Sequence, residues 1–163
     1  MTPSDLQHLK RAIELSARAR GDGKHPFAAI VVAADGSVLS EAGNNSLPPA
    51  GDPTQHAELR AAQMACRSAS TAQLASATLY TSAEPCAMCS GAIYWCGIGR
   101  VVYALSEESL LRLTGDHPEN PTFSLPCREV FARGQREVEV LGPALEEEAS
   151  VAHRGFWQRD GAS

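Results

Sequence analysis

The sequence predicts an α/β fold, in which a mixed five-stranded sheet lies between helices as a three-layer α/β/α sandwich. Short apolar stretches rich in β-forming residues alternate with helical patterns along the chain. A turn signal joins the first two of these stretches, which indicates an antiparallel hairpin. A later succession of strand, helix and strand predicts parallel pairing through a right-handed crossover.

The length and composition are those of one globular domain covering residues 1–163. The chain has 44% hydrophobic and 20% charged residues, which is ordinary for a globular protein with a substantial core. We find no internal repeat and no linker. Because no basic leader precedes an apolar run and no apolar segment reaches membrane-spanning length, we expect a cytoplasmic protein without a membrane partner.

The first elements follow from local signals. Ser4 or Asp5 can cap an opening helix that ends near the breaker at 21–23, and its apolar residues recur at helical spacing: Leu6, Leu9, Ile13 and Ala17. Residues 27–33 and 38–44 then form the two strands of the hairpin. A loop rich in Pro and Gly leads from the hairpin to the next helix.

The second half of the chain alternates strands and helices around one long polar loop. Residues 114–122 are turn-forming throughout, and a polar loop after a strand is a good place for substrate contacts. We expect strands at 77–81, 100–105 and 137–141, helices at 107–113 and 125–132, and a final helix from 143 toward Phe156 and Trp157.

One histidine and two cysteines form the pattern of a catalytic zinc site. His56, Cys86 and Cys89 are three borderline-soft ligands that leave a fourth position open for water. Glu58 adds a carboxylate that need not touch the metal. A redox Cys-x-x-Cys needs no His-x-Glu, and a structural zinc site has four closed ligands, so catalytic zinc is the preferred interpretation.

The spacing places these residues at two helix starts. Cys-x-x-Cys at a helix N-terminus directs two sulfurs at one ion, and Pro85 suits the first turn of that helix. His56 and Glu58 converge if they lie at the N-terminus of a helix capped by Thr54. The remaining cysteines are expected to be inert, and the histidines to lie at the surface or in loops: Cys66, Cys96, Cys127, His8, His25 and His153.

The charge balance bears on the partner of the protein. The net charge is −5 and the sequence pI is near 5.5, whereas proteins that bind a polyanion display clustered Lys and Arg. This balance disfavours a nucleic-acid substrate. Five cysteines, an odd number with two at the metal site, favour a reducing compartment.

His-x-Glu followed by Pro-Cys-x-x-Cys resembles the zinc-dependent cytidine deaminase superfamily. Within it, residues 6–105 are similar to the branch of bacterial guanine deaminases and tRNA adenosine deaminases, through the segments 44–45, 52–58, 80–82, 84–89 and 91–95. The resemblance implies Zn²⁺, hydrolytic release of ammonia from a small aminated nucleobase or nucleoside, and a homodimer. The alternatives are a tRNA adenosine-to-inosine deaminase and a catalytically silent zinc scaffold.

The resemblance also assigns roles to single residues. Glu58 is expected to carry the proton, Asn44 or its neighbour Asn45 to bond the base, and the backbone N–H of Ala57 to anchor a base oxygen. Phe27 and Trp95 are expected to form the pocket. The branch places an aspartate in the loop after the fourth strand; here His117 occupies that position with Asp116 beside it. In this branch the C-terminal tail is expected to close the partner's pocket with an aromatic by a domain swap. Phe156 and Trp157 either do this here or pack on their own domain.

Overall fold

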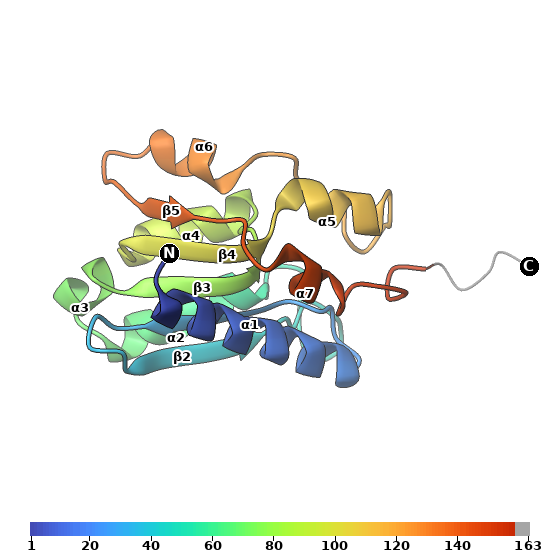
Figure 1. Ribbon diagram of the computed structural model, residues 1–163, viewed down its shortest axis with the longest axis horizontal. Coiled ribbons are helices and arrows are strands. Elements are labelled where there is room, and N and C mark those ends of the chain that lie inside the picture. The colour runs from blue at the N-terminus through green and yellow to red at the C-terminus, as the bar shows by residue number, and fades with distance from the viewer. Residues whose placement is uncertain (159–163) are drawn as a thin grey trace, which may run out of the picture.

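The computed structural model describes residues 1–158, and its centre is one mixed sheet (Figure 1). The sheet has five strands in the order β2-β1-β3-β4-β5. The predicted fold class is therefore confirmed. The strands span Ala28–Val32 (β1), Val38–Gly43 (β2), Thr78–Ala83 (β3), Arg100–Leu105 (β4) and Glu139–Leu141 (β5).

The pairing changes direction in the middle of the sheet. Strand β1 is antiparallel to both β2 and β3, whereas β3, β4 and β5 are parallel to one another. The parallel pairing of β3 and β4 confirms the predicted crossover. Since the carboxyl ends of β3 and β4 lie at the same edge, residues that follow these strands meet there.

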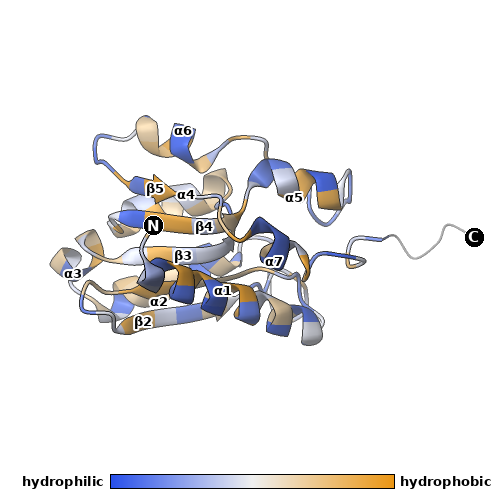
Figure 2. Cartoon of the chain, in the orientation of Figure 1, coloured by the Kyte–Doolittle hydropathy of each residue, from blue (hydrophilic) through white to orange (hydrophobic). Residues whose placement is uncertain are grey.

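Helices cover both faces of the sheet. The first face carries α1 (Pro3–Gly21), α5 (Glu107–Thr114) and α7 (Glu146–Ser150), and the second carries α2 (Ala57–Ser68), α4 (Ala87–Cys96) and α6 (Cys127–Ala132). Along β3, Leu79 packs in the core of the second face and Tyr80 in that of the first, as the period of two requires. Figure 2 shows helix α1 with both polar and apolar residues, as expected for a helix that covers a sheet.

Three predicted helix starts are wrong by one to a few residues. Helix α1 is capped by Thr2, whose hydroxyl accepts the N–H of Asp5 while the Asp5 carboxylate accepts the N–H of Thr2. His56 itself caps α2, because Thr54 bonds to Asp52 instead. In α4 the N-cap is Cys86, so Pro85 stands just before the helix rather than in its first turn.

Two other elements differ from expectation. The sequence analysis missed the short helix α3 (Thr71–Ala75), which begins with a capping box between Ser70 and Gln73. The final helix is much shorter than predicted, because α7 ends at Ser150 and turns follow to Phe156. Within residues 1–158, no helix is both long and apolar enough to span a membrane.

Candidate active site

Two helix N-termini bring the predicted metal ligands together. His56 caps α2 and Cys86 caps α4, and these two helices pack side by side on one face of the sheet. The ligand atoms of His56, Cys86 and Cys89 all lie within 4.8 Å of one another, with Nδ1 of His56 3.6 Å from Sγ of Cys86. In the described part of the chain, no other three His, Cys, Asp or Glu residues cluster in this way.

The donor set and its charge suit zinc. One imidazole and two thiols are the ligand types that a tetrahedral zinc ion with one open position takes. Hydrogen bonding from Cys89, and then from His56, lowers the pKa of Cys86 to about 4, whereas the same Cys86 contact raises the pKa of Cys89. The pair therefore already holds one thiolate, and a bound cation would favour loss of the second proton.

Glu58 lies beside this cluster in a buried position. Glu58 is 4% exposed, and its Oε2 lies 3.5 Å from Sγ of Cys89. Burial raises the pKa of Glu58. Thr81 Oγ1 lies 3.1 Å from Glu58 Oε1 and 2.9 Å from the carbonyl oxygen of Ala83. Thr81 has one hydroxyl hydrogen, so it can donate to only one of these two oxygens. If Glu58 carries a proton on Oε1 and donates it to Thr81, then Thr81 donates to Ala83, and all three oxygens are hydrogen-bonded.

A cavity in two parts opens onto these residues. The inner part, about 40 Å³, is lined by Phe27, Asn44, His56 and Glu58 among others, and the outer part measures about 480 Å³. Both parts share His56, Cys86, Glu107 and Asn120. The buried carboxylate therefore lies at the narrow end of a cavity that widens toward the surface.

Most of the residues predicted from the hairpin and α2 lie at the inner cavity. Asn44 and Phe27 both line it. Asn45 turns instead to the loop, where its side chain bonds to Lys24, Ala50 and Gln55. The N–H of Ala57 belongs to the first turn of α2, where backbone N–H groups have no partner within the helix.

The long loop contributes residues other than the predicted pair. Positions 118–123 line the outer cavity, and Asn120 reaches the inner part as well. Asp116 is exposed and lies outside both linings. The ring of His117 stacks edge-on against Trp157, and its Nδ1 accepts the backbone N–H of Glu119.

The predicted aromatic residues lie in two different places. Trp95 is 86% exposed at the far end of α4 and lines neither part of the cavity, so its expected role in the pocket stays a prediction. Phe156 and Trp157 pack back onto their own domain, where Trp157 is buried against His25, Phe27 and His153. This placement is the own-domain alternative, and exchange of the tail with a partner stays a prediction.

Two carboxylates at this edge of the sheet were missed by the sequence analysis. Buried Glu84 accepts the backbone N–H groups of Glu107 and Cys127, and so joins the starts of α5 and α6. Glu107 lines both parts of the cavity, and burial, with the nearby thiol of Cys86, raises its pKa to about 8. The sequence signal was their position directly after β3 and β4.

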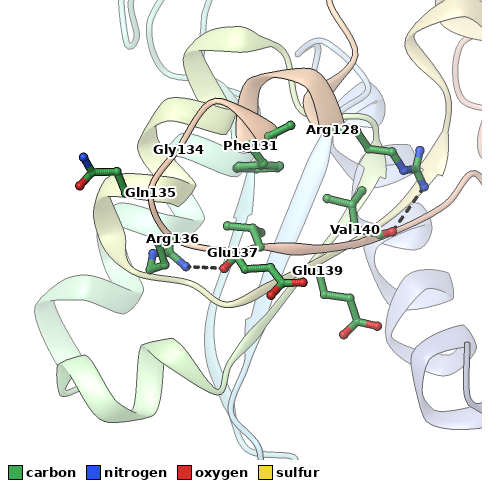
Figure 3. A pocket seen from close by; sticks show the side chains of 10 residues that line it. Arg128, Phe131, Gly134, Gln135, Arg136, Glu137, Glu139 and Val140 are labelled. Atoms are coloured by element: carbon green, nitrogen blue, oxygen red, sulfur yellow. Dashed lines mark hydrogen bonds between the residues drawn. The ribbon is translucent and has the colours of Figure 1, made fainter.

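A larger hollow lies elsewhere, at the sheet edge. Figure 3 shows it between α6 and β5, lined by Arg128, Phe131, Arg136 and Val140 among others, with a volume of about 600 Å³. Its arginines bond mainly to backbone carbonyl oxygens, such as those of Val140 and Glu137. It contains none of the residues of the His56 cluster, so we assign the active site to the smaller two-part cavity.

The fold and this cluster are those of a zinc-dependent hydrolase. The chain belongs to the family described as the cytidine and deoxycytidylate deaminase zinc-binding region, whose sequence pattern matches residues 2–105. This match covers the sheet as far as β4 and includes all residues of the metal cluster. The loop at 114–122 and the C-terminal segment lie outside it.

The similar proteins include deaminases of nucleobases and tRNA-specific adenosine deaminases. A probable cytosine deaminase of Schizosaccharomyces pombe is 43% identical over 96% of this chain and 94% of its own. The guanine deaminase of Bacillus subtilis is 44% identical over 59% of this chain and 61% of its own. The solved guanine deaminase of Nitrosomonas europaea superimposes with a TM-score of 0.72 at 25% identity, over 93% of this chain and 82% of that chain.

Proposed function

We propose that this zinc-dependent deaminase removes the amino group of a small free nucleobase, with ammonia as the second product. The observation that carries the proposal is the buried Glu58 beside the His56 cluster, at the inner end of a cavity that Asn44 also lines. The cytosine and guanine deaminases among the relatives support a free base over a nucleoside.

The proposed reaction replaces a C–N bond by a C–O bond. Water adds to the ring carbon that bears the amino group, ammonia leaves, and the ring keeps a carbonyl oxygen. Zinc, which His56, Cys86 and Cys89 would hold, supplies a Lewis acid that lowers the pKa of water toward about 7. The carboxylate of Glu58 takes a proton from the attacking water, delivers it to the ring nitrogen, and assists the departure of ammonia.

The ring is held by residues of the hairpin and of α2. Two hydrogens from Ser46, its backbone N–H and its hydroxyl, point at Oδ1 of Asn44, so the Nδ2 group is the side of this amide that can donate to a substrate acceptor. The N–H of Ala57 offers a second donor, and Phe27 supplies an apolar wall. A carbonyl oxygen or unprotonated nitrogen on the ring meets both donors.

The charge of the chain supports a small substrate rather than a nucleic acid. The net charge is −5, and the outer cavity includes the carboxylates of Glu107 and Glu119. A polynucleotide, which is a polyanion, would meet a chain of the same sign of net charge. A tRNA substrate would instead require a basic surface, and its binding would weaken steeply as salt is raised.

We also propose that the protein is a cytoplasmic homodimer. Helix α4 is apolar on nearly every side, and it leaves Met88 and Trp95 exposed on either side of Gly91 and Ala92. A helix that is apolar all round is normally buried, and a second copy would cover this face. The five cysteines are free thiols, which agrees with a reducing compartment.

The test of the proposal is Glu58→Gln with ammonia release as the assay. We expect turnover to fall by about 10² to 10⁴, because the variant cannot carry the proton, while bound zinc stays at the wild-type level. Glu14→Gln, on the exposed side of α1, is the matched control and should retain full activity. A Glu58→Gln protein that keeps more than a tenth of wild-type turnover would rule out the assigned role.

The substrate is identified by a panel of free bases and nucleosides, with guanine and cytosine included. Release of ammonia from a base but not from its nucleoside supports the proposal. Turnover of nucleosides alone would contradict the proposal. So would turnover of an anticodon stem-loop whose binding weakens steeply with salt.

A further inference from the structure

His25 lies in the loop between α1 and β1, as expected, but its side chain is buried there. It is 4% exposed, and both ring nitrogens have partners. Nδ1 lies 3.2 Å from Oγ of Ser46, and Nε2 lies 2.9 Å from Oε2 of Glu119. The proposed reaction uses Ser46 to orient Asn44 but gives the imidazole of His25 no role, so the burial of this polar side chain has no explanation in it.

The hydrogens of this chain of contacts can be assigned from its donors and acceptors. The backbone N–H of Ser46 can only donate, so the Asn44 atom 2.8 Å away is the oxygen Oδ1. The Ser46 hydroxyl lies 2.7 Å from the same oxygen and gives it its single hydrogen. Toward His25, Oγ of Ser46 must therefore accept, which places a hydrogen on Nδ1.

The other ring nitrogen faces a carboxylate. A carboxylate oxygen accepts hydrogen bonds, so Nε2 of His25 donates to Glu119, whose side chain is 54% exposed. With hydrogens on both ring nitrogens, each hydrogen-bond donor from Glu119 through His25 and Ser46 to Asn44 faces an acceptor. The ring then lies between an acceptor hydroxyl and a carboxylate, and donates to both.

One end of this chain fixes the amide of Asn44. A flipped amide would point its Nδ2 hydrogens at the N–H of Ser46, which leaves buried donors without acceptors and is therefore unfavourable. Asn44 lines the inner cavity with Glu58 and is itself buried. The orientation that Ser46 enforces therefore decides whether this residue offers a substrate a donor or an acceptor.

The other end fixes the loop over the outer cavity. Glu119 and its neighbours at 118–123 form one wall of that cavity. The other hydrogen bonds described for 117–123 are local, such as those of His117 with Glu119 and Asn120 and of Asn120 with Thr122. The contact of Glu119 with His25 therefore ties this wall to the turn before β1, and Trp157 packs on the same imidazole ring.

We propose that His25 is a positioning residue that couples the closed position of the 117–123 loop to the orientation of the Asn44 amide. This inference rests on the proposed function, in which Asn44 binds the base. A loop that opens withdraws Glu119 from His25, and the ring then no longer holds the Ser46 hydroxyl toward Asn44. Substrate binding and loop closure thus stabilise each other through one buried side chain.

Kinetics separate this role from simple packing. His25→Asn keeps a donor near the Nδ1 position but does not reach Glu119, whereas His25→Gln reaches toward Glu119 but loses the bond to Ser46. We expect each variant to raise KM about tenfold, with kcat changed less than threefold and zinc content unchanged. His8→Gln, at a histidine that packs on Tyr80 of β3, is the control and should leave KM unchanged.

A double-mutant cycle tests the coupling itself. Ser46→Ala and Glu119→Ala remove the two partners of His25. If His25 connects them, the double variant raises KM no more than the worse single variant. If the two increases in KM multiply, the sites act independently and the proposal is overturned.

A measurement without turnover keeps the test separate from the proposed function. NMR of protein labelled with ¹⁵N in the histidine rings should show hydrogens on both nitrogens of His25, and Glu119→Ala should remove one and shift the side-chain amide signals of Asn44. A neutral His25 ring in the wild type, or Asn44 signals unaffected by Glu119→Ala, would overturn the inference. If these signals respond as expected but no base releases ammonia, the proposed function fails while the coupling stands.

Discussion

Two buried carboxylates lie on opposite faces of strand β3. Tyr80 and Thr81 are consecutive residues of this strand, so their side chains point to opposite faces. The hydroxyl of Tyr80 donates to Asp5 on the side of α1, 2.8 Å away, whereas Thr81 contacts Glu58 on the side of α2. Asp5 is 2% exposed, so both carboxylates are almost equally shielded from water.

The two carboxylates differ in the charge that faces them. The guanidinium of Arg100 bonds to both oxygens of Asp5, at 2.7 and 3.0 Å, and lowers the pKa of Asp5. Within residues 1–158, the side chains that bond to Glu58 are those of Thr81 and Cys89, and burial raises its pKa more than the nearby imidazole of His56 lowers it. A compensated carboxylate stabilises the fold, whereas an uncompensated one next to a metal cluster is suited to exchange a proton.

The largest expected effect comes from removing the compensated carboxylate. Asp5→Asn leaves the charge of Arg100 beside a buried neutral group, so the free energy of unfolding at pH 7 should fall by about 3 kcal/mol. Urea denaturation followed by circular dichroism measures this change. Because Asp5 lies on the other face of the sheet from Glu58, kcat of the folded variant should equal that of the wild type.

The same pair predicts a pH dependence with a definite sign. The folded pKa of Asp5 is depressed below the unfolded value near about 3.9, so its contribution is present above that pH and is lost as the pH falls below it. Wild-type stability should therefore decrease in acid more than that of Asp5→Asn. Equal slopes for the two proteins below about pH 4 would contradict the assigned ion pair.

A smaller effect is expected on the catalytic face. Thr81→Val is close in shape and removes the hydroxyl that meets Glu58 Oε1. A hydrogen bond to a charged group contributes about 1.5 to 3 kcal/mol, so kcat should fall at least about tenfold, with zinc content and unfolding free energy nearly unchanged. Thr71→Val on exposed α3 is the control. A loss of zinc in Thr81→Val would mean that the hydroxyl supports the metal cluster instead.

The features that the sequence predicted well are those with local signals. The order of strands and helices follows from apolar periodicity and turn residues, and the spacing of His56, Cys86 and Cys89 brought them to two helix starts. Burial of polar side chains depends on distant partners, so it was missed. Asp5 was predicted as a cap, yet it pairs with Arg100 across 95 positions of the chain.

The cavity wall shows why loop residues are harder to predict. Position along the chain suggested Asp116 or His117 as the contact, but turn geometry decides which side chain faces inward. His117 turns to Trp157, and its Nδ1 and carbonyl oxygen accept the N–H groups of Glu119 and Asn120. Asn120 is thereby the loop residue that reaches the inner cavity.

The smallest expected effect concerns this loop wall of the cavity, which we compare with the two carboxylates that contact β3. Asn120→Ala removes a polar group that lines both parts of the cavity, so KM should rise about fivefold, the equivalent of one hydrogen bond of about 1 kcal/mol. Zinc content, kcat and unfolding free energy should stay at wild-type values, because the loop lies outside the metal helices. The measurement is ammonia release over a range of base concentrations.

Asp116→Asn is the matched control for the loop. It changes an exposed side chain outside both linings, and KM should stay within about twofold of the wild type. If Asp116→Asn instead raises KM and Asn120→Ala does not, the loop turns its other side to the substrate. Selectivity would then depend on a carboxylate in the loop, as the resemblance to guanine deaminases implies. An exposed carboxylate would then act on the substrate in addition to the buried Glu58.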